Sequence, residues 1–241
     1  MGKIAKRGFV PTDKREFGEQ SICKLFNAGK DLNYLLNRKY NIKNASIFVQ
    51  NHYLLSERQR LALVRGISST EQIHIRKSKE VKAIPKDCIV NIDGFNTIIT
   101  LEVALSDSLL LVGMDGTIRD LASLRGTYRL IDKTDIAITL IGKTLEKYHI
   151  KKAVFYLDEP VSNSIRLKQL IINLLQSYSF EVQVEIIPGV DSTLEKLDNV
   201  VTSDAIILDK CLSWINLNKE IIENIEPKTR YVDFNLMESS S

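Results

Sequence analysis

Hydrophobic and polar positions follow different patterns in the two parts of this chain. Up to about residue 66, apolar residues recur three and four positions apart, as Leu32 and Leu36 do, which is typical of amphipathic helices. Gly29 is expected to end one helix, Asp31 to cap the next, and the Ser56–Gln59 capping box to begin another. The first part is therefore predicted to be a module of about four short helices.

Beyond Pro85 the pattern changes to short apolar runs that alternate with amphipathic stretches of helical period. The runs that we interpret as strands are Ile89–Asp93, Ala153–Asp158, Val182–Ile187, Val200–Thr202 and Arg230–Phe234. Buried strands that alternate with helices predict a parallel sheet with helices on both faces. We therefore expect a small all-α domain over residues 1–84, followed by a three-layer α/β domain over residues 85–241.

Two further segments fall outside this alternation. Leu109–Val112 and Ile118 flank Asp115-Gly116, a pair that is typical of tight turns, so we expect a hairpin beside the main sheet. In the charge-rich segment between the two predicted domains, Gln72–Ile75 is interpreted as a short strand.

A carboxylate follows four of the predicted strands closely. Asp93 and Asp158 end their strands, whereas Asp191 and Asp204 come a few residues after theirs. Because the carboxyl ends of parallel strands meet at one edge of a sheet, we expect these side chains to converge. Converging carboxylates repel one another and favour a bound cation, for which Mg²⁺ or Mn²⁺ is the oxygen-seeking choice. Taken singly, each aspartate is better explained as a turn or cap residue. Glu102, on the helix after Asp93, is a candidate fifth member or a solvated helix carboxylate.

The order of these motifs resembles that of a known superfamily. In chain order the motifs are Ile92-Asp93-Gly94-Phe95-Asn96, Tyr156-Leu157-Asp158, Val190-Asp191 and Val201-Thr202-Ser203-Asp204. They resemble the motifs of the PIN-like superfamily, most closely its NYN branch of metal-dependent ribonucleases, over roughly residues 88–210. The chain as a whole also resembles prokaryotic, largely archaeal, proteins that join a small helical domain to a body of this kind.

The resemblance implies roles for individual residues. The implied metal ligands are Asp93, Asp158, Asp191 and Asp204. Among these, Asp93 is the implied central ligand, and Asp93, Asp158 and Asp204 are the implied catalytic residues. Asn96 and the hydroxyl groups of Thr202 and Ser203 would position ligands or a phosphate.

Other polar residues are candidates for binding a substrate. Arg119, Arg125 and Arg129 belong to a partly basic loop near the predicted sheet edge. Such a loop suits phosphate binding and suits an ordinary surface equally well. Ser162 and Ser164, in the polar segment after Asp158, are further candidates.

Charge is distributed unevenly along the chain. Residues 1–85 carry a net charge of +10 and residues 86–241 a net charge of −7, which together give +3. A basic helical module suits contact with a polyanion such as RNA, although basic helices are as often only solvated.

Composition narrows the class of protein. At 241 residues with 44% hydrophobic residues, the chain has the composition of a globular protein. No apolar run approaches the ~18 residues that span a membrane, and the first residues contain no secretory stretch. The three cysteines are far apart, which argues against a zinc site and fits a reducing cytoplasm. We expect a cytoplasmic protein without membrane contact, with a homodimer as one expected state.

These observations support three hypotheses on function. The first is a Mg²⁺- or Mn²⁺-dependent phosphodiesterase that cleaves RNA, in which the acidic cluster activates a water molecule. The second is a non-catalytic RNA- or nucleotide-binding protein, in which the carboxylates are only caps. The third is hydrolysis of small phosphorylated molecules. The first two hypotheses differ in whether a metal ion stabilises the protein and whether turnover occurs.

Overall fold

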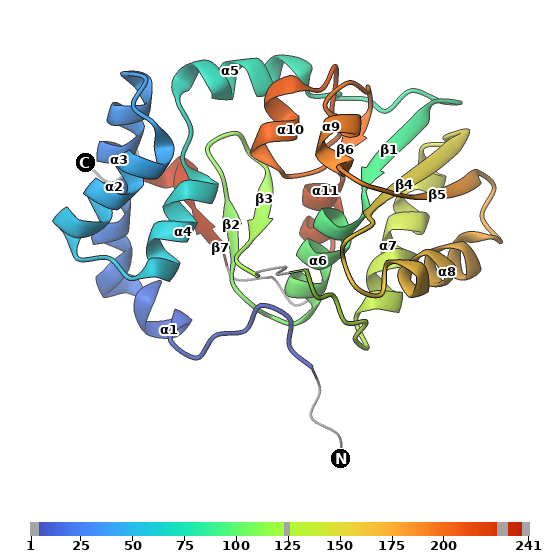
Figure 1. The fold of residues 1–241 in the computed structure, drawn as a ribbon, viewed down its shortest axis with the longest axis horizontal. Helices are drawn as coiled ribbons and strands as arrows, with labels where there is room; N and C mark the ends of the chain where they lie inside the picture. Colours follow the sequence, from blue (N-terminus) through green and yellow to red (C-terminus); the bar gives the residue numbers. More distant parts are fainter. Residues whose placement is uncertain (1–4, 123–125, 226–230, 238–241) are drawn as a thin grey trace.

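The computed structural model describes residues 5–122, 126–225 and 231–237 (Figure 1). The N-terminal part of the chain forms a helical module: α1 (Asp13–Glu16), α2 (Glu19–Asn37), α3 (Ile42–Tyr53), α4 (Glu57–Gly66) and α5 (Thr70–Lys79). The buried apolar side chains of α2, α3 and α4, Leu25, Leu32 and Leu63 among them, share one core. Across the described residues, no helix combines the length and apolar character needed to cross a bilayer.

Two local predictions in the helical module are wrong. α2 runs through Gly29, where we expected a helix end, and Asp31 lies inside it. A Cβ atom at position 29 would lie 2.5 Å from Sδ of Met237, so this glycine permits close packing and does not end the helix. The strand predicted at Gln72–Ile75 is part of α5, whose first turn is closed by a capping box.

An α/β body follows the helical module. Its elements, in chain order, are β1 (Ile89–Asp93), α6 (Gly94–Leu105), β2 (Leu110–Val112), β3 (Ile118–Asp120), α7 (Thr134–Lys147), β4 (Lys152–Asp158), α8 (Ser164–Leu175), β5 (Glu181–Ile187), α9 (Val190–Leu194), β6 (Val200–Val201), α10 (Ala205–Lys210), α11 (Leu217–Glu223), β7 (Tyr231–Asp233) and a 3₁₀ turn (Phe234–Met237). The fold is therefore mixed α/β, as predicted.

The main sheet is parallel, with its strands in the order β5-β4-β1-β6 in the described residues. Successive side chains of a strand point to opposite faces, and β4 shows the consequence. Phe155 and Leu157 pack into the large core that α6, α7, α8 and α11 cover. Tyr156, between them, packs against the separate core formed by α9 and α10. Helices therefore cover both faces of the sheet, and short helices cover the face beside the site.

A small second sheet has the strand order β3-β2-β7 in the described residues. The predicted hairpin is confirmed, because β2 pairs antiparallel with β3. The last predicted strand, β7, pairs parallel with β2 instead of extending the main sheet. Leu111 and Val232 of this sheet, together with Phe234, pack into the core of the helical module. The core of the helices is thus completed by segments from beyond residue 84, and the division at that residue stays a prediction.

Candidate functional site

Asp93 lies where β1 passes into α6, buried at 7% exposure. Its carboxylate caps α6, because Oδ1 accepts a hydrogen bond from the Asn96 amide at 3.3 Å. Its other oxygen, Oδ2, accepts a hydrogen bond from Oγ1 of Thr202 at 2.8 Å. The pairing of β1 with β6 matches Ile92 with Val201. Asp93 follows Ile92 and Thr202 follows Val201, so the register of the two strands places Asp93 and Thr202 side by side.

Asn96 ties the same turn to the segment after β6. Its Oδ1 accepts hydrogen bonds from the backbone amide of Ser203 at 2.9 Å and from the Ser203 hydroxyl at 3.0 Å. Thr202 in turn accepts a bond from the amide of Asp204 at 3.1 Å. The two motifs that are farthest apart in the sequence, Asp-Gly-Phe-Asn and Thr-Ser-Asp, thus form one hydrogen-bonded unit.

The other predicted carboxylates lie at the same edge of the sheet. Asp204 caps α10, with Oδ1 accepting bonds from the amides of Ile206 at 2.7 Å and Ile207 at 3.3 Å. Asp191 lies in the first turn of α9, and Asp158 ends β4. β4 neighbours β1, and α9 contacts both strands, so the topology brings these residues to the edge where Asp93 lies.

Burial and neighbouring carboxylates both act on the protonation of these aspartates. The pKa of Asp93 is raised to about 7, chiefly by burial and also by the charges of Asp204 and Asp191, while the hydrogen bonds from Thr202 and Asn96 act in the opposite direction. Burial also raises the pKa of Asp191, followed by the charges of Asp204 and Asp158. Burial raises the pKa of Asp158 as well. Each of the four predicted aspartates therefore interacts with at least one of the others.

The carboxylates open into a cleft of about 540 Å³ between the body and the helical module. Residues of the body that line it include Asp93, Asn96, Asp158, Asp191, Ser203 and Asp204. The opposite wall comes from α4 and α5, with Arg65, Gln72 and Arg76. A concave site with convergent polar groups at a sheet edge is the expected form of a ligand-binding site.

The donor set suits a hard divalent cation that keeps part of its water shell. In the described part of the chain, no group of three or more His, Cys, Asp or Glu side chains is arranged to hold a metal ion. Mg²⁺ is commonly held by only one or two carboxylates together with water molecules. Asp93, with either Asp204 or Asp191 beside it, meets that requirement, because each oxygen of the Asp93 carboxylate can accept more than the one hydrogen bond that it makes here.

Several predicted substrate-binding residues either lie outside the cleft or are already paired within the protein. Arg119 lines the cleft but is buried and paired with Asp115, and Arg125 lies outside the described residues. Arg129 is exposed and is not among the residues lining the cleft. Ser162 accepts a bond from the Tyr128 amide, 3.2 Å away.

Two more of the predicted polar residues are buried away from the cleft. Ser164 begins α8, and neither it nor Ser162 is among the residues that line the cleft. Glu102 is fully buried and accepts bonds from Arg7, Tyr128 and Thr134. It therefore stabilises a separate part of the body, and neither reading proposed from the sequence describes it.

Three further residues line the cleft and were not among the predicted site residues: Arg65, Arg76 and Asp209. The capping box predicts the helix that carries Arg65, but no local signal indicates that this helix faces the acidic edge of the sheet. Their role depends on how the helical module packs on the body, which the local pattern does not encode.

Comparison with known proteins gives two family matches and one similar protein. Residues 82–220, more than half of the chain, match the family described as "Domain of unknown function (DUF5616)", and residues 24–79 match "Protein of unknown function (DUF434)". The chain therefore belongs to the DUF5616 family. It is 35% identical over 205 residues to "Uncharacterized protein MJ0935" of Methanocaldococcus jannaschii, covering 83% of this chain and 98% of that relative. No solved structure gives a significant match.

Proposed function

We propose that this protein is a Mg²⁺- or Mn²⁺-dependent phosphodiesterase of the PIN-like, NYN type that cleaves RNA. The observation that carries the proposal is the convergence of Asp93, Asp158, Asp191 and Asp204 on one cleft, where Asp93 is largely buried. The motif order that resembles the NYN ribonucleases supports the same conclusion.

Some residues of the site would hold the metal ion, and others would orient the attacking water molecule. Asp93, held by Thr202 and Asn96, would be the central ligand, with Asp204 and Asp191 next to it. When bound, the metal ion would polarise a water molecule and stabilise negative charge on the scissile phosphate. Asp158 lies at the end of the neighbouring strand, where its carboxylate can orient that water.

The substrate phosphates need positive groups that are not already neutralised. Arg76 and Arg119 have only 2% and 6% of their side chains exposed and are paired with carboxylates. Arg65 has 32% of its side chain exposed, and its one contact with a carboxylate, that of Asp120, is long at 3.4 Å. Its other hydrogen bonds go to the backbone carbonyls of Asp120 and Ala122, which carry no net charge and leave the positive charge of Arg65 uncompensated. Among the described residues that line the cleft, Arg65 is thus best placed to contact a substrate phosphate.

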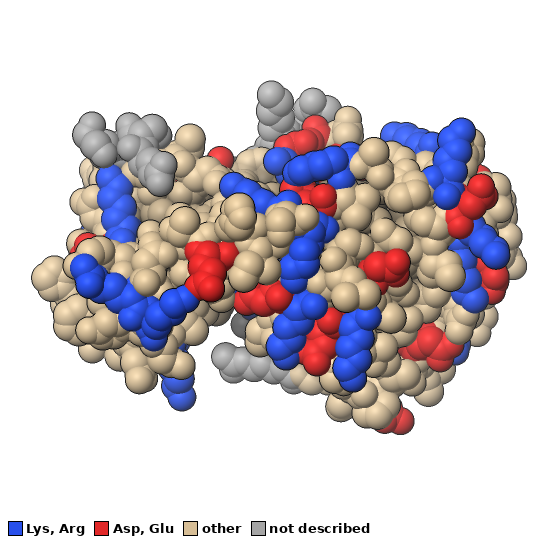
Figure 2. Space-filling model, turned by 90° about the horizontal axis from the view of Figure 1, so that it is seen from above, with Lys and Arg blue, Asp and Glu red and all other residues tan. Residues whose placement is uncertain are grey.

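The net positive charge of residues 1–85 overstates the positive surface that is available to RNA. Several arginines of the helical module form ion pairs within the protein, such as Arg58 with Asp13 and Arg60 with Glu57. Figure 2 shows Lys and Arg interspersed with Asp and Glu over the face that α5 crosses. RNA would therefore be guided by local positive groups and by bound cations.

The decisive experiment measures cleavage of a single-stranded RNA by the wild-type protein and by Asp93→Asn. We expect cleavage with Mn²⁺ or Mg²⁺, none with chelator, and a loss of more than about 100-fold in Asp93→Asn, because removing a ligand exceeds the 10–100-fold effect of a supporting residue. Asp107→Asn, at an exposed position, is the control and should cleave like the wild type. Undiminished cleavage by Asp93→Asn would refute the mechanism.

One observation favours a second candidate, a non-catalytic RNA- or nucleotide-binding protein. Asp93 and Asp204 both cap helices, and the described carboxylates form no ready-made group of three around an ion. A protein of this kind would bind RNA equally well with metal or chelator and would show no turnover. Metal-dependent cleavage excludes it.

A further inference from the structure

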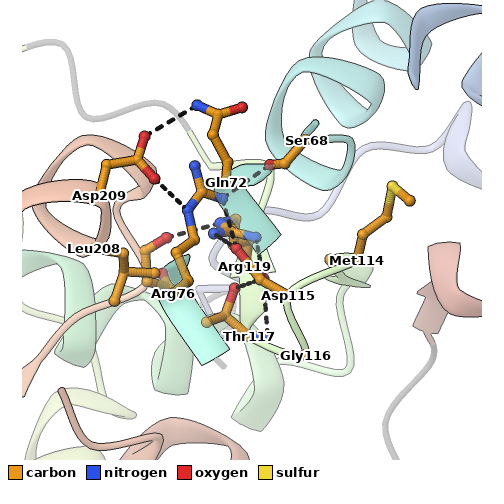
Figure 3. Close-up of polar contacts among 12 residues, drawn as sticks. Ser68, Gln72, Arg76, Met114, Asp115, Gly116, Thr117, Arg119, Leu208 and Asp209 are labelled. Carbon is orange, nitrogen blue, oxygen red and sulfur yellow. Dashed lines mark hydrogen bonds and ion pairs between the residues drawn. The ribbon is translucent and has the colours of Figure 1, made fainter. Parts of the chain in front are cut away.

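A buried cluster of opposite charges adjoins the candidate site (Figure 3). Arg76 comes from α5, Asp115 and Arg119 from the β2–β3 hairpin, and Asp209 from α10. The side chains of Arg76, Asp115 and Arg119 are only 2%, 1% and 6% exposed. Charges at this depth persist only when they are paired and fully hydrogen-bonded, so their relative positions are tightly fixed.

Asp115 is the centre of the cluster. Arg119 binds it with two nitrogens, Nη1 to Oδ1 at 3.0 Å and Nη2 to Oδ2 at 2.7 Å, and Arg76 Nη1 binds Oδ2 at 2.7 Å. Thr117 adds its amide and its hydroxyl, at 3.1 and 2.7 Å. Burial alone would raise the pKa of Asp115, but Arg119 and then Arg76 outweigh it and hold that pKa below its usual range.

The remaining nitrogen of Arg119 reaches the site. Its Nε donates to the backbone carbonyl of Ser203 at 2.7 Å. Ser203 is the residue whose amide and hydroxyl bind Asn96, and it lies between Thr202, which binds Asp93, and Asp204. The Ser203 peptide is therefore held from one side by the β1–α6 turn and from the other by the charged cluster.

Arg76 links the same cluster to the helical module. Its Nη1 also donates to the Ser68 hydroxyl at 2.8 Å, and its Nε binds Oδ1 of Asp209 at 2.6 Å. Gln72 of α5 binds the other oxygen of Asp209 at 3.1 Å. α5 thus fixes α10, the helix that Asp204 caps.

We propose that Arg119 is a positioning residue of the candidate site. Fixed by Asp115 and through it by Arg76, Arg119 holds the Ser203 carbonyl and so sets Thr202 and Asp204 relative to Asp93. All three nitrogens of Arg119 donate within the protein, so it aligns the ligands and does not bind the substrate phosphate that the sequence suggested. The inference rests on the proposed function and adds the helical module to the parts that align the site.

The test is Arg119→Lys in the full-length protein. Lysine keeps the charge, but its single ammonium group cannot bind both oxygens of Asp115 and the Ser203 carbonyl in the same fixed geometry. We expect the affinity for Mn²⁺, measured by calorimetric titration, and kcat for RNA cleavage to fall by about 10–100-fold. KM should stay within about two-fold, because the substrate contacts remain.

Arg58→Lys is the matched control. Arg58 is also largely buried, binds Asp13 with two nitrogens and donates to the carbonyls of Gly8 and Leu121, but it is not among the residues that line the cleft. If the role of Arg119 is positional, Arg58→Lys lowers the melting temperature while Mn²⁺ affinity and kcat stay at the wild-type values. An Arg119→Lys protein with both values within two-fold of wild type would overturn the proposal.

Hydrogen exchange separates this proposal from the proposed function. Arg119→Lys should accelerate amide exchange in residues 202–208, and Arg58→Lys should not. If the wild type neither binds Mn²⁺ nor cleaves RNA, the proposed function fails, and unchanged exchange in Arg119→Lys then refutes the positioning as well. If Arg119→Lys does not fold, Thr117→Val, which removes one bond to Asp115, should give a smaller change in the same direction.

Discussion

At the scale of single residues, the two oxygens of Asp93 serve two distant parts of the chain. One caps α6 through Asn96, and the other accepts the hydroxyl of Thr202. A buried carboxylate near other carboxylates is destabilised in its charged form, which is the common condition of residues selected for chemistry. A cap residue needs neither burial nor like-charged neighbours, so the setting of Asp93 favours a functional role.

The pH dependence of stability follows from this setting. The pKa of Asp93 is raised from 3.8 to about 7, so the folded protein binds this proton more tightly than the unfolded chain. That contribution to stability is complete below pH ~4 and is lost as the pH rises through ~7, amounting to roughly 2–3 kcal/mol between pH 5 and 8.

Asp93→Asn cannot titrate at this position, so with chelator present it should gain stability relative to the wild type between pH 5 and 8. Denaturant unfolding at several pH values measures the difference. Asp107→Asn, at an exposed position, should run parallel to the wild type. A constant difference between Asp93→Asn and the wild type at all pH values would contradict the expectation.

At the scale of elements, the site is built by the junctions between strands and helices. Gly94 shows why the motif needs a glycine, because a Cβ atom there would lie 2.5 Å from Leu157 and 3.0 Å from the Tyr156 carbonyl. The glycine thus lets α6 begin directly against β4. The strand–helix junctions that carry Asp93 and Asp204 are drawn together because β6 pairs with β1 and the Ser203 amide binds Asn96.

The cap of α10 distinguishes a structural from a functional aspartate. Asp204→Asn retains an oxygen that can accept the bonds from Ile206 and Ile207, whereas Asp204→Ala loses them at a cost of about 1 kcal/mol. We expect Asp204→Asn to keep near wild-type stability but lose metal-dependent cleavage, and Asp204→Ala to lose both. Thermal unfolding and the cleavage assay measure the two effects. Full cleavage by Asp204→Asn would leave Asp204 only as a cap.

At the scale of the whole molecule, the body contributes residues to the core of the helical module, and the helical module contributes residues to the cleft of the body. Val232 and Phe234 from the end of the chain complete the core of the helices. In return, α4 and α5 provide one wall of the cleft, with Arg65 and Arg76. The two segments that match family models, residues 24–79 and 82–220, are therefore adjacent in the sequence and also line the same cleft.

This arrangement predicts a role for the helical module in RNA binding. Arg65→Gln should weaken binding of single-stranded RNA and reduce the slope of log Kd against log salt by about 0.7, the value for one lost phosphate contact. Arg60→Gln, on the same helix but paired with Glu57 outside the cleft, is the control and should leave the slope unchanged. Fluorescence anisotropy at several salt concentrations measures both. Equal slopes in the two variants would exclude Arg65 as the phosphate contact.

The sequence by itself determined the alternation of strands and helices in the body, the hairpin and the set of aspartates that meet at the sheet edge. These features depend on local period and on the rule that parallel strands end at one edge. The end predicted at Gly29 is wrong because the role of this glycine depends on packing against Met237, whereas the capping box that makes Gln72–Ile75 helical is a local signal in the sequence. Only the tertiary structure decided that Arg119 faces Asp115 and the Ser203 carbonyl, because that choice depends on partners four and 84 residues away. The second wall of the cleft, formed by α4 and α5, likewise depends on how the helical module packs on the body, and no local pattern in the sequence encodes that contact.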